Sequence, residues 1–245
     1  MNEKIINFIK KSTKKILQLS LFPFITFDYI KFIRNEKRFT IKLKDIYSCV
    51  LDKTTQTHFD AHYIYHTSWA ARKLKSIHPS FHIDISSSLF FVGIASAFVP
   101  INFYDYRPAY LKLSNLQSSH ADLTNLNFSD SSIQSLSCMH TIEHIGLGRY
   151  GDPIDNNGDL KAISELKRVL SVNGSLLFVV PVGAPRIQYN AHRIYSFEMI
   201  QEYFKDLTLK EFTLINDDGD YIENADPDMV QNQKYACGCF WFIKQ

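Results

Sequence analysis

The sequence predicts an α/β protein with a doubly wound, mostly parallel sheet. Short apolar runs alternate with stretches of helical periodicity, which is typical of parallel strands joined by helices. Carboxylates follow several of the apolar runs, at the edge where open α/β sheets bind their ligands. With 245 residues, 45% of them hydrophobic, the chain is long enough for one such domain and a shorter extension. We therefore expect a basic amphipathic extension over residues 1–60 and the α/β domain over residues 61–245.

The elements expected in the domain follow from apolar patterning and from the residues that interrupt it. Helical periodicity starts at Tyr63 and ends before His78-Pro79, because proline disfavours helical backbone in the residue before it. Pro181 is expected to close a buried strand. Strands are expected at residues 81–85, 101–104, 133–139 and 175–180, with a short element leading to 121–122 and late antiparallel strands at 209–215 and 239–243. Helices are expected at residues 63–75, 89–98 and 160–170.

The N-terminal extension carries the excess positive charge of the chain. Residues 1–44 contain 11 Lys and Arg but only three Asp and Glu, a net charge of +8, and the remaining residues have a net charge of −6. Apolar residues recur at helical spacing from Ile5 to Leu19, and an aromatic, basic stretch runs from Phe27 to Lys44. The pattern suits a helix on an anionic membrane surface, and equally a helix packed on the main domain with its lysines in water. The acidic remainder of the chain argues against nucleic acid as a partner.

Cysteine usage and the N-terminal sequence favour a cytoplasmic location. Cys237 and Cys239 are the only close pair among the four cysteines, and this spacing on one strand is poor for a disulfide and incomplete for a zinc site. Reduced thiols at apolar strand positions are the simpler interpretation. No signal-peptide pattern is evident. We expect a cytoplasmic protein, attached at most peripherally to the inner face of the membrane, and no metal site.

Three aspartates lie where a nucleoside-containing cofactor needs hydrogen-bond acceptors. Asp84 ends the first predicted strand, Asp105 ends the second, and Asp122 lies in the turn before the fourth. A carboxylate in the first position suits an ammonium group, one in the second accepts from a ribose diol, and one in the third accepts from an exocyclic amine. Together these groups describe S-adenosylmethionine better than NAD. Each aspartate could alternatively be a helix cap or a turn residue.

The segment from His140 to Pro153 is the most unusual stretch of the chain. It follows the apolar run that ends at Met139, and it combines two histidines, a glutamate and a glycine-rich loop. A helix and another buried strand come next. The sequence therefore predicts a reactive loop at the carboxyl edge of the sheet.

These motifs resemble those of the DUF268 family, a branch of the class I S-adenosylmethionine-dependent methyltransferases. The resemblance covers about residues 63–242. It rests on His82-Ile-Asp84-Ile-Ser-Ser-Ser88, Asp105-Tyr-Arg107-Pro108, Ala121-Asp122-Leu-Thr-Asn125, the loop from Ser137 to Asp155, Glu165-Leu-Lys-Arg168-Val-Leu, Val180-Pro181-Val-Gly183, Asn190-Ala-His192-Arg193 and Ile222-Glu223-Asn224.

The resemblance implies a Rossmann-like methyltransferase that uses S-adenosylmethionine. Members of the family look like envelope-polysaccharide cluster proteins, which implies a carbohydrate or lipid-linked glycan acceptor. Related proteins typically carry glycine where this chain has Ser86, because glycine lets the cofactor approach the backbone. The cofactor-binding residues are expected to be Asp84, Ser86, Asp105, Asp122 and Met139.

Methyl transfer to a hydroxyl also requires a base whose pKa lies near the working pH. We expect this base to be His144 or His140, with Glu143 orienting an imidazole. The whole catalytic group is expected to comprise His140, Glu143, His144 and His192. Acceptor-binding residues are expected to be Arg149, Asp152, Asn190 and Arg193, since arginine binds phosphate or carboxylate by paired hydrogen bonds. A metal held by the two loop histidines and the Asp152/Asp155 loop is a weaker alternative.

Two functions from different classes fit these observations. The first is an S-adenosylmethionine-dependent methyltransferase that O-methylates a sugar of a cell-surface polysaccharide or lipopolysaccharide. The second is a non-catalytic protein that keeps the fold and acts as a scaffold in a polysaccharide assembly complex. The reactive loop favours the enzyme, and Ser86 favours the scaffold. An NAD-dependent sugar enzyme would need a G-x-G-x-x-G turn, which this sequence lacks.

Overall fold

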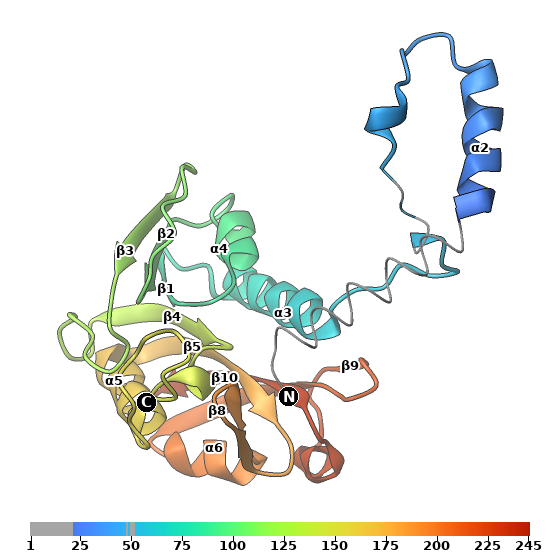
Figure 1. Cartoon of the computed structure of the whole chain (residues 1–245). Coiled ribbons are helices and arrows are strands. Elements are labelled where there is room, and N and C mark those ends of the chain that lie inside the picture. Colours follow the sequence, from blue (N-terminus) through green and yellow to red (C-terminus); the bar gives the residue numbers. More distant parts are fainter. Residues whose placement is uncertain (1–21, 48, 50–51) are drawn as a thin grey trace. The chain divides into compact units, whose positions relative to one another are not determined.

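The computed structural model describes residues 22–47, 49 and 52–245 (Figure 1). By its backbone contacts the chain divides into two units, Met1–His58 and Phe59–Gln245. In the first unit, helix α2 spans Phe22–Asn35 and the short helix η1 spans Leu43–Asp45. The helix expected from Ile5 to Leu19 lies outside the described residues. No helix in the described part is long and apolar enough to cross a membrane.

The second unit is built on an eight-stranded sheet with the order β3-β2-β1-β4-β5-β10-β8-β9. Neighbours from β3 to β5 are parallel, and β10 is antiparallel to both β5 and β8. The sheet is therefore mostly parallel, as the sequence predicts. The strands are β1 (His82–Ile85), β2 (Ile101–Asp105), β3 (Leu116–His120), β4 (Ile133–Met139), β5 (Leu170–Val182), β8 (Leu207–Ile215), β9 (Tyr221–Ile222) and β10 (Ala236–Lys244).

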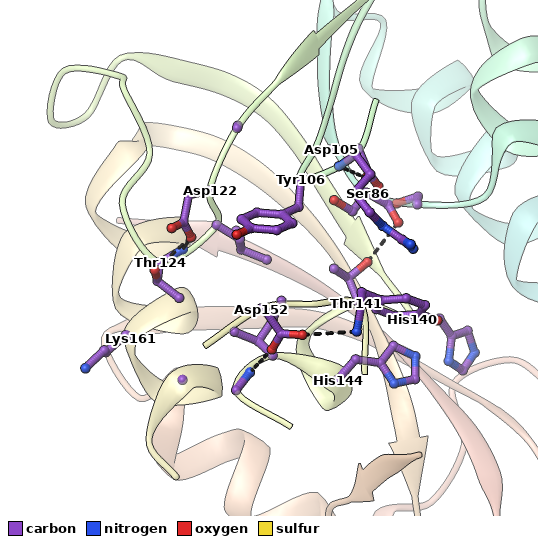
Figure 2. A pocket seen from close by; sticks show the side chains of 18 of the residues that line it. Ser86, Asp105, Tyr106, Asp122, Thr124, His140, Thr141, His144, Asp152 and Lys161 are labelled. Atoms are coloured by element: carbon purple, nitrogen blue, oxygen red, sulfur yellow. Dashed lines mark hydrogen bonds between the residues drawn. The ribbon is translucent and has the colours of Figure 1, made fainter. Parts of the chain in front are cut away.

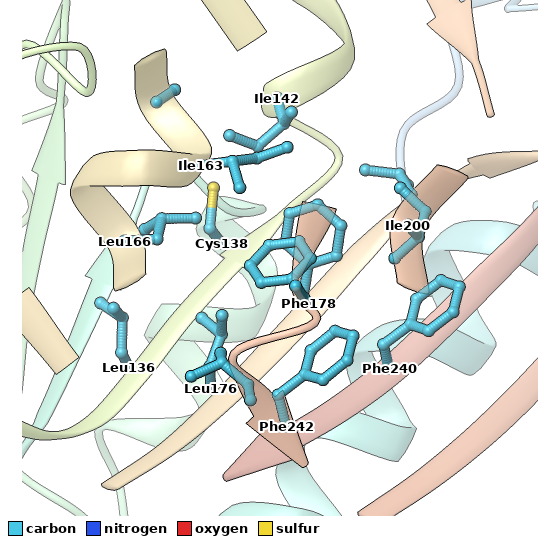
Figure 3. Packing of buried hydrophobic residues seen from close by; sticks show 14 of the residues in the cluster. Leu136, Cys138, Ile142, Ile163, Leu166, Leu176, Phe178, Ile200, Phe240 and Phe242 are labelled. Carbon is cyan, nitrogen blue, oxygen red and sulfur yellow. The ribbon is translucent and has the colours of Figure 1, made fainter. Parts of the chain in front are cut away.

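Helices cover both faces of this sheet (Figure 1). Side chains of α3 and α4 pack with Leu177 and Val179 of β5, and side chains of α5 and α6 pack with Leu176 and Phe178 of the same strand. Successive residues of a strand point to opposite faces, so one strand serves both cores. Figure 3 shows the second of these cores. The helices are α3 (Ala61–Ile77), α4 (Leu89–Ala95), α5 (Gly158–Val169) and α6 (Phe197–Tyr203), and the short helices are η3 (Ile142–His144) and η4 (Pro227–Asn232).

The doubly wound arrangement and the principal strands are confirmed, with some differences in extent. Strand β5 runs on to Val182 instead of stopping at Pro181. Strand β4 pairs with β5 only as far as Val179. Pro181 lies beyond that point, so its missing N–H removes no hydrogen bond between β5 and β4. Its carbonyl accepts from the backbone N–H of Tyr195. A two-stranded hairpin of β6 (Arg186–Gln188) and β7 (His192–Ile194), absent from the predicted elements, follows β5.

Candidate cofactor and acceptor site

Two pockets open at the carboxyl edge of the parallel strands. The register pairs Asp84 of β1 with Phe103 of β2 and with Ser137 of β4, so these three strands end at one level. The first pocket has a volume of about 430 Å³ and the second of about 950 Å³. Three side chains line both of them: Tyr63, His140 and His144. The two histidines of the reactive loop therefore lie at the boundary between the two pockets.

The first pocket brings together Asp105 and Asp122, two of the carboxylates expected to bind cofactor (Figure 2). The Oδ1 atom of Asp105 accepts from the backbone N–H of Arg107 at 2.6 Å. The Oδ1 atom of Asp122 accepts from both the N–H and the hydroxyl of Thr124, at 2.8 and 2.7 Å. These bonds hold the two side chains in place at the ends of β2 and β3. Ser86 and Met139, the other two residues of the predicted cofactor site that reach this pocket, also line it.

Asp84 lies beneath the first pocket and is fully buried. It accepts from the backbone N–H of Ser87 at 3.0 Å and from the hydroxyl of Ser137. Burial raises the pKa of Asp84 to about 6, although the hydrogen bonds from both serines lower it. Its carboxylate is not part of the pocket lining, which differs from the placement expected for a direct ligand of an ammonium group.

A buried histidine that sequence reasoning did not single out supports this aspartate. The His82 ring bonds to the hydroxyls of Ser135 and Ser137, at 2.7 and 2.8 Å. Burial lowers the pKa of His82 to about 3, so the ring is neutral. Ser137 donates to Asp84, so it accepts its bond from the imidazole, and a continuous chain of hydrogen bonds crosses from β4 through β1 to the turn that follows.

The turn after β1 adopts left-handed backbone at Ser86, where φ is 57°. Glycine adopts this conformation at little cost, whereas a side chain strains it. Ser86 is held there by a backbone bond to the carbonyl of Tyr104 at 2.7 Å and by a bond from the Thr141 hydroxyl to its own carbonyl at 2.9 Å. The chain thus keeps a glycine-like turn with serine in it.

Asp152 organises the glycine-rich loop instead of projecting freely into the pocket. Its Oδ2 atom accepts from the backbone N–H groups of Gly146 and Gly148, at 2.7 and 3.3 Å, and Oδ1 accepts from Tyr150 at 3.2 Å. Both glycines have positive φ. Asp152 lines the first pocket, but its carboxylate is already occupied by the loop that it shapes (Figure 2).

His144 lines both pockets and has one unprotonated ring nitrogen. Its Nδ1 lies 2.6 Å from the carbonyl oxygen of Ala191, so Nδ1 carries the proton and donates. Nε2 is consequently the unprotonated atom, and it lies 3.8 Å from Oε1 of Glu143. Burial lowers the pKa of His144, while Glu143 raises it. A neutral imidazole with an accessible lone pair can accept a proton.

His140 has different surroundings from His144. Its Nδ1 lies 2.9 Å from Oε1 of Glu143, and its Nε2 lies 3.3 Å from the sulfur of Cys237. Burial lowers the pKa of His140, but its contacts with Cys237 and Glu143 raise it, and the net direction is upward. The backbone of His140 is left-handed, with a φ of 54°, and turns the chain from β4 into η3. The ring of His140 consequently faces Cys237 in β10.

The remaining residues expected at the site fall into two groups. His192 and Arg149 line the second pocket, and Arg149 donates to the carbonyl of Ala191 at 2.9 Å. Arg193 is buried, donates to the carbonyl of Ile145 at 2.6 Å and pairs with Asp159 at 3.5 Å, so it braces the reactive loop from below. Asn190 is exposed and lines neither pocket.

Residues from α3 and from the segment before β10 complete the second pocket. His62 and Tyr63 come from the start of α3, and Tyr235 stacks on His62 with ring centroids 5.4 Å apart. These residues were missed because the expected helix was not tied to the reactive loop. The one signal available was the pair of histidines four residues apart, His62 and His66, which share a helix face.

Comparisons with known proteins concern the family and the fold. A family described as "Caenorhabditis protein of unknown function, DUF268" matches residues 111–207. This segment is a DUF268 segment. It contains β3, β4, the reactive loop, α5, β5 and α6, whereas β1 and β2, which end at Ile85 and Asp105, lie outside it. No curated protein sequence matches the chain.

Solved structures share the fold of the second unit at low sequence identity. YcgJ from Bacillus subtilis is 16% identical, with a TM-score of 0.51 over 74% of this chain and 99% of that one. A putative sarcosine dimethylglycine methyltransferase from Galdieria sulphuraria is 13% identical, with a TM-score of 0.51 over 74% and 86%. The N-methyltransferase NodS from Bradyrhizobium japonicum, solved with S-adenosyl-L-homocysteine, is 14% identical, with a TM-score of 0.50 over 75% and 87%. The second unit of this chain therefore has the class I methyltransferase fold.

Proposed function

We propose that this DUF268 protein is an S-adenosylmethionine-dependent methyltransferase that O-methylates a sugar hydroxyl of a cell-surface polysaccharide or lipopolysaccharide. One observation carries the proposal. A cofactor-sized pocket and a larger polar pocket are both lined by His144, whose Nδ1 donates to the Ala191 carbonyl and thereby leaves Nε2 unprotonated. O-methylation suits this arrangement, because the acceptor hydroxyl must reach the methyl donor directly while a base beside that hydroxyl takes its proton.

The first pocket fits the proposed cofactor. Its volume of about 430 Å³ lies within the usual range for ligand pockets. Asp105 can accept from the ribose hydroxyls and Asp122 from the adenine amine. Asp84, ionised at neutral pH because its pKa is about 6, supplies negative charge beneath the floor of the pocket. When bound, S-adenosylmethionine would supply an electrophilic methyl group.

The second pocket suits a polyhydroxylated acceptor. It is lined by aromatic rings and by charged and amide side chains, including Tyr235, Arg149 and Gln233. Within the part of the chain that the structure describes, Oε2 of Glu143 and Nε2 of His192 are buried without a hydrogen-bond partner. Buried polar atoms are almost always paired, so these two are positioned to bind acceptor hydroxyls.

His144 is the residue that we assign as general base. Its Nε2 accepts the proton of the acceptor hydroxyl, while the Ala191 carbonyl holds the ring in the required tautomer. Glu143, 3.8 Å away, stabilises the imidazolium that forms. Arg149 donates to the same carbonyl and fixes the position of the loop that carries it.

The glycan acceptor and the membrane setting rest on the family resemblance and on the charge of residues 1–44. A lipid-linked glycan precursor would be presented at the inner membrane face, where a basic segment is attracted to anionic lipid. The first unit adds exposed aromatic side chains in its described part, among them Phe27, Phe32 and Phe39. These features support peripheral attachment of the enzyme near its acceptor.

The test is methyl transfer from methyl-labelled S-adenosylmethionine to lipid-linked glycan and to polysaccharide fractions. The wild type should label a carbohydrate fraction. His144→Ala should lower turnover by about 10²–10⁴-fold, the usual contribution of a general base, with cofactor binding retained. His58→Ala, a change in an exposed loop, is the matched control and should not alter turnover. Full activity of His144→Ala would show that His144 is not the general base.

Ser86 favours a second candidate function, a non-catalytic scaffold in a polysaccharide assembly complex. Its side chain lines the first pocket at the turn where glycine would let a ligand approach the backbone. The scaffold predicts no binding of S-adenosylmethionine, even after Ser86→Gly. The enzyme predicts binding by the wild type and equal or tighter binding by Ser86→Gly, since glycine removes both the strain and the side chain.

A further inference from the structure

We propose that His62, His140 and Cys237 form a binding site for a divalent transition metal with the ligand preferences of Zn²⁺. The ligand atoms of these three side chains all lie within 4.8 Å of one another. They come from three separate elements: the start of α3, the end of β4 and the start of β10. Imidazole and thiolate are ligands that Zn²⁺ prefers, whereas Mg²⁺ and Ca²⁺ prefer oxygen.

The distance between two of the ligands already suits a tetrahedral ion. Nε2 of His140 lies 3.3 Å from the sulfur of Cys237. Zinc bonds of about 2.0–2.1 Å to nitrogen and about 2.3 Å to sulfur place such atoms about 3.6 Å apart at a tetrahedral angle. Small movements of the two side chains would therefore admit the ion. Cys237 would lose its proton to solvent and bind as a thiolate.

Glu143 prepares His140 for this role. It accepts from Nδ1 of His140 at 2.9 Å, which leaves Nε2, the atom that faces Cys237, to bind the ion after it loses its proton. A carboxylate that holds the outer nitrogen of a metal-binding histidine is a recurring feature of zinc sites. The carboxylate and the imidazole are both almost fully buried, so their geometry is fixed by packing.

A second histidine of α3 adds an independent sign that the cluster is built for a ligand. His66 is fully buried, and its ring packs edge-on against that of His140, with centroids 4.9 Å apart. Its Nδ1 donates to the carbonyl of His62 at 2.6 Å, so Nε2 keeps its lone pair. Among the described residues this Nε2 has no hydrogen-bond partner. His66 thus places a further imidazole, with one unpaired nitrogen, against the ring of the ligand His140.

The open side of the site faces the proposed acceptor. His62 and His140 line the second pocket, so a metal with three protein ligands would present its fourth position there. Catalytic zinc sites have this arrangement, with water or substrate as the fourth ligand. This role rests on the proposed function: a metal-bound acceptor hydroxyl would lose its proton more readily, and His144 would receive it.

The test uses the purified full-length protein, stripped of metal and titrated with Co²⁺ as a spectroscopic substitute for Zn²⁺. One equivalent should bind and give a thiolate-to-cobalt charge-transfer band. Cys237→Ser should abolish the band. Glu143→Gln removes the carboxylate that orients His140 and should weaken Zn²⁺ binding by roughly 10–100-fold. Cys237→Ser removes a ligand and should weaken Zn²⁺ binding by more than that.

Matched variants keep the test decisive. Cys239→Ser changes an equally buried thiol whose sulfur lies 4.0 Å from that of Cys237 but outside the group of three ligands, so it should retain the band. His62→Ala alters a partly buried side chain, so it decides the matter if Cys237→Ser does not fold by circular dichroism. A wild type that binds no Co²⁺, a band that survives in Cys237→Ser, or a band lost in Cys239→Ser would each overturn the assignment.

Calorimetry with S-adenosylhomocysteine separates this inference from the proposed function. A protein that binds the nucleoside but no metal refutes the metal site and leaves the methyltransferase standing. A protein that binds metal but no nucleoside refutes the methyltransferase and leaves the metal site standing.

Discussion

Each functional side chain at the sheet edge is held by a neighbour that determines its chemical state. The Ala191 carbonyl sets the tautomer of His144, and Glu143 orients the ring of His140 and raises its pKa. Two histidines four residues apart in sequence therefore differ in role: one is suited to accept a proton, the other to hold a ligand at Nε2. Their spacing in the sequence could not distinguish them, because the distinction depends on partners from elsewhere in the chain: Ala191 in the turn between β6 and β7, and Cys237 in β10.

The buried carboxyl of Asp84 should make stability depend on pH. Its pKa is about 6 in the folded protein and near the ordinary value of 3.8 in the unfolded chain. Between these values the folded state binds the proton and the unfolded state does not, so this contribution to stability is lost as pH rises from about 4 to 6. The size is on the order of 3 kcal/mol for a shift of about two units.

Urea denaturation of the wild type and Asp84→Asn from pH 4 to pH 7 measures this effect. The comparison cancels the titration of His82 and the other buried groups, which both proteins share. The free energy of unfolding of the variant, relative to the wild type, should rise by the stated amount over this range. A difference that stays constant with pH would contradict the pKa assigned to Asp84.

At the scale of elements, the reactive loop is shaped by backbone geometry as much as by its reactive side chains. Gly146, Gly148 and Gly151 all have positive φ, and Asp152 ties the first two together. Arg193 holds the loop from below through the carbonyl of Ile145. The loop is therefore a rigid support for His140 and His144.

Two glycines of this loop offer a matched pair of substitutions. A Cβ at Gly146 would overlap the backbone oxygen of Asp155, whereas a Cβ at Gly151 would meet nothing within 4 Å. Both residues have similar φ, 80° and 86°, so the backbone strain is shared. Gly146→Ala should cost about 1–3 kcal/mol more stability than Gly151→Ala, the usual range for overpacking. Thermal and urea unfolding of both variants measure the difference, and equal costs would contradict this packing of the loop.

The elements also show what the sequence could and could not predict. Strands β1, β4 and β5 were predictable because they are buried on both faces and therefore read as apolar runs. Hairpin β6–β7 was not, because β6 is exposed throughout and carries no apolar alternation. Asp105 and Asp122 were placed correctly at the edge of the sheet, since a residue that follows a parallel strand must lie there.

The sequence did not predict which side chains from distant elements would come into contact. Cys237 was assigned to a strand as a small apolar residue, and it does lie buried in β10. Its contact with His140, however, depends on β10 pairing with β5 rather than with β4, which no local pattern encodes. The same holds for Tyr235 and His62, which meet only because α3 packs across the sheet.

At the scale of the whole molecule, the N-terminal segment and the domain that carries the site have net charges of opposite sign. Residues 1–44 have a net charge of +8, and the rest of the chain has a net charge of −6. An anionic membrane attracts the first and repels the second, so attachment through residues 1–44 would keep the acidic domain in water. Each basic residue near the surface contributes about 1 kcal/mol.

Removal of residues 1–44 should abolish co-sedimentation with vesicles that contain anionic lipid. Binding of the full chain should weaken as salt shortens the Debye length, which is about 10 Å at 0.1 M. Sedimentation of both chains over a range of salt concentrations measures this. Aggregation of the truncated chain would mean that the segment packs on the domain, and salt-independent binding would mean that aromatic side chains hold the protein to the membrane.

The central claim is that the pocket lined by Asp105 and Asp122 binds S-adenosylmethionine. Calorimetric titration with S-adenosylhomocysteine tests it most directly, on the wild type, on Asp105→Ala and on Asp130→Ala, an exposed carboxylate outside both pockets as the control. The wild type and the control should both bind S-adenosylhomocysteine. Asp105→Ala should weaken the binding free energy by about 1.5–3 kcal/mol, the usual contribution of a hydrogen bond to a charged group. Absence of binding by the wild type, or equal binding by Asp105→Ala, would contradict the central claim.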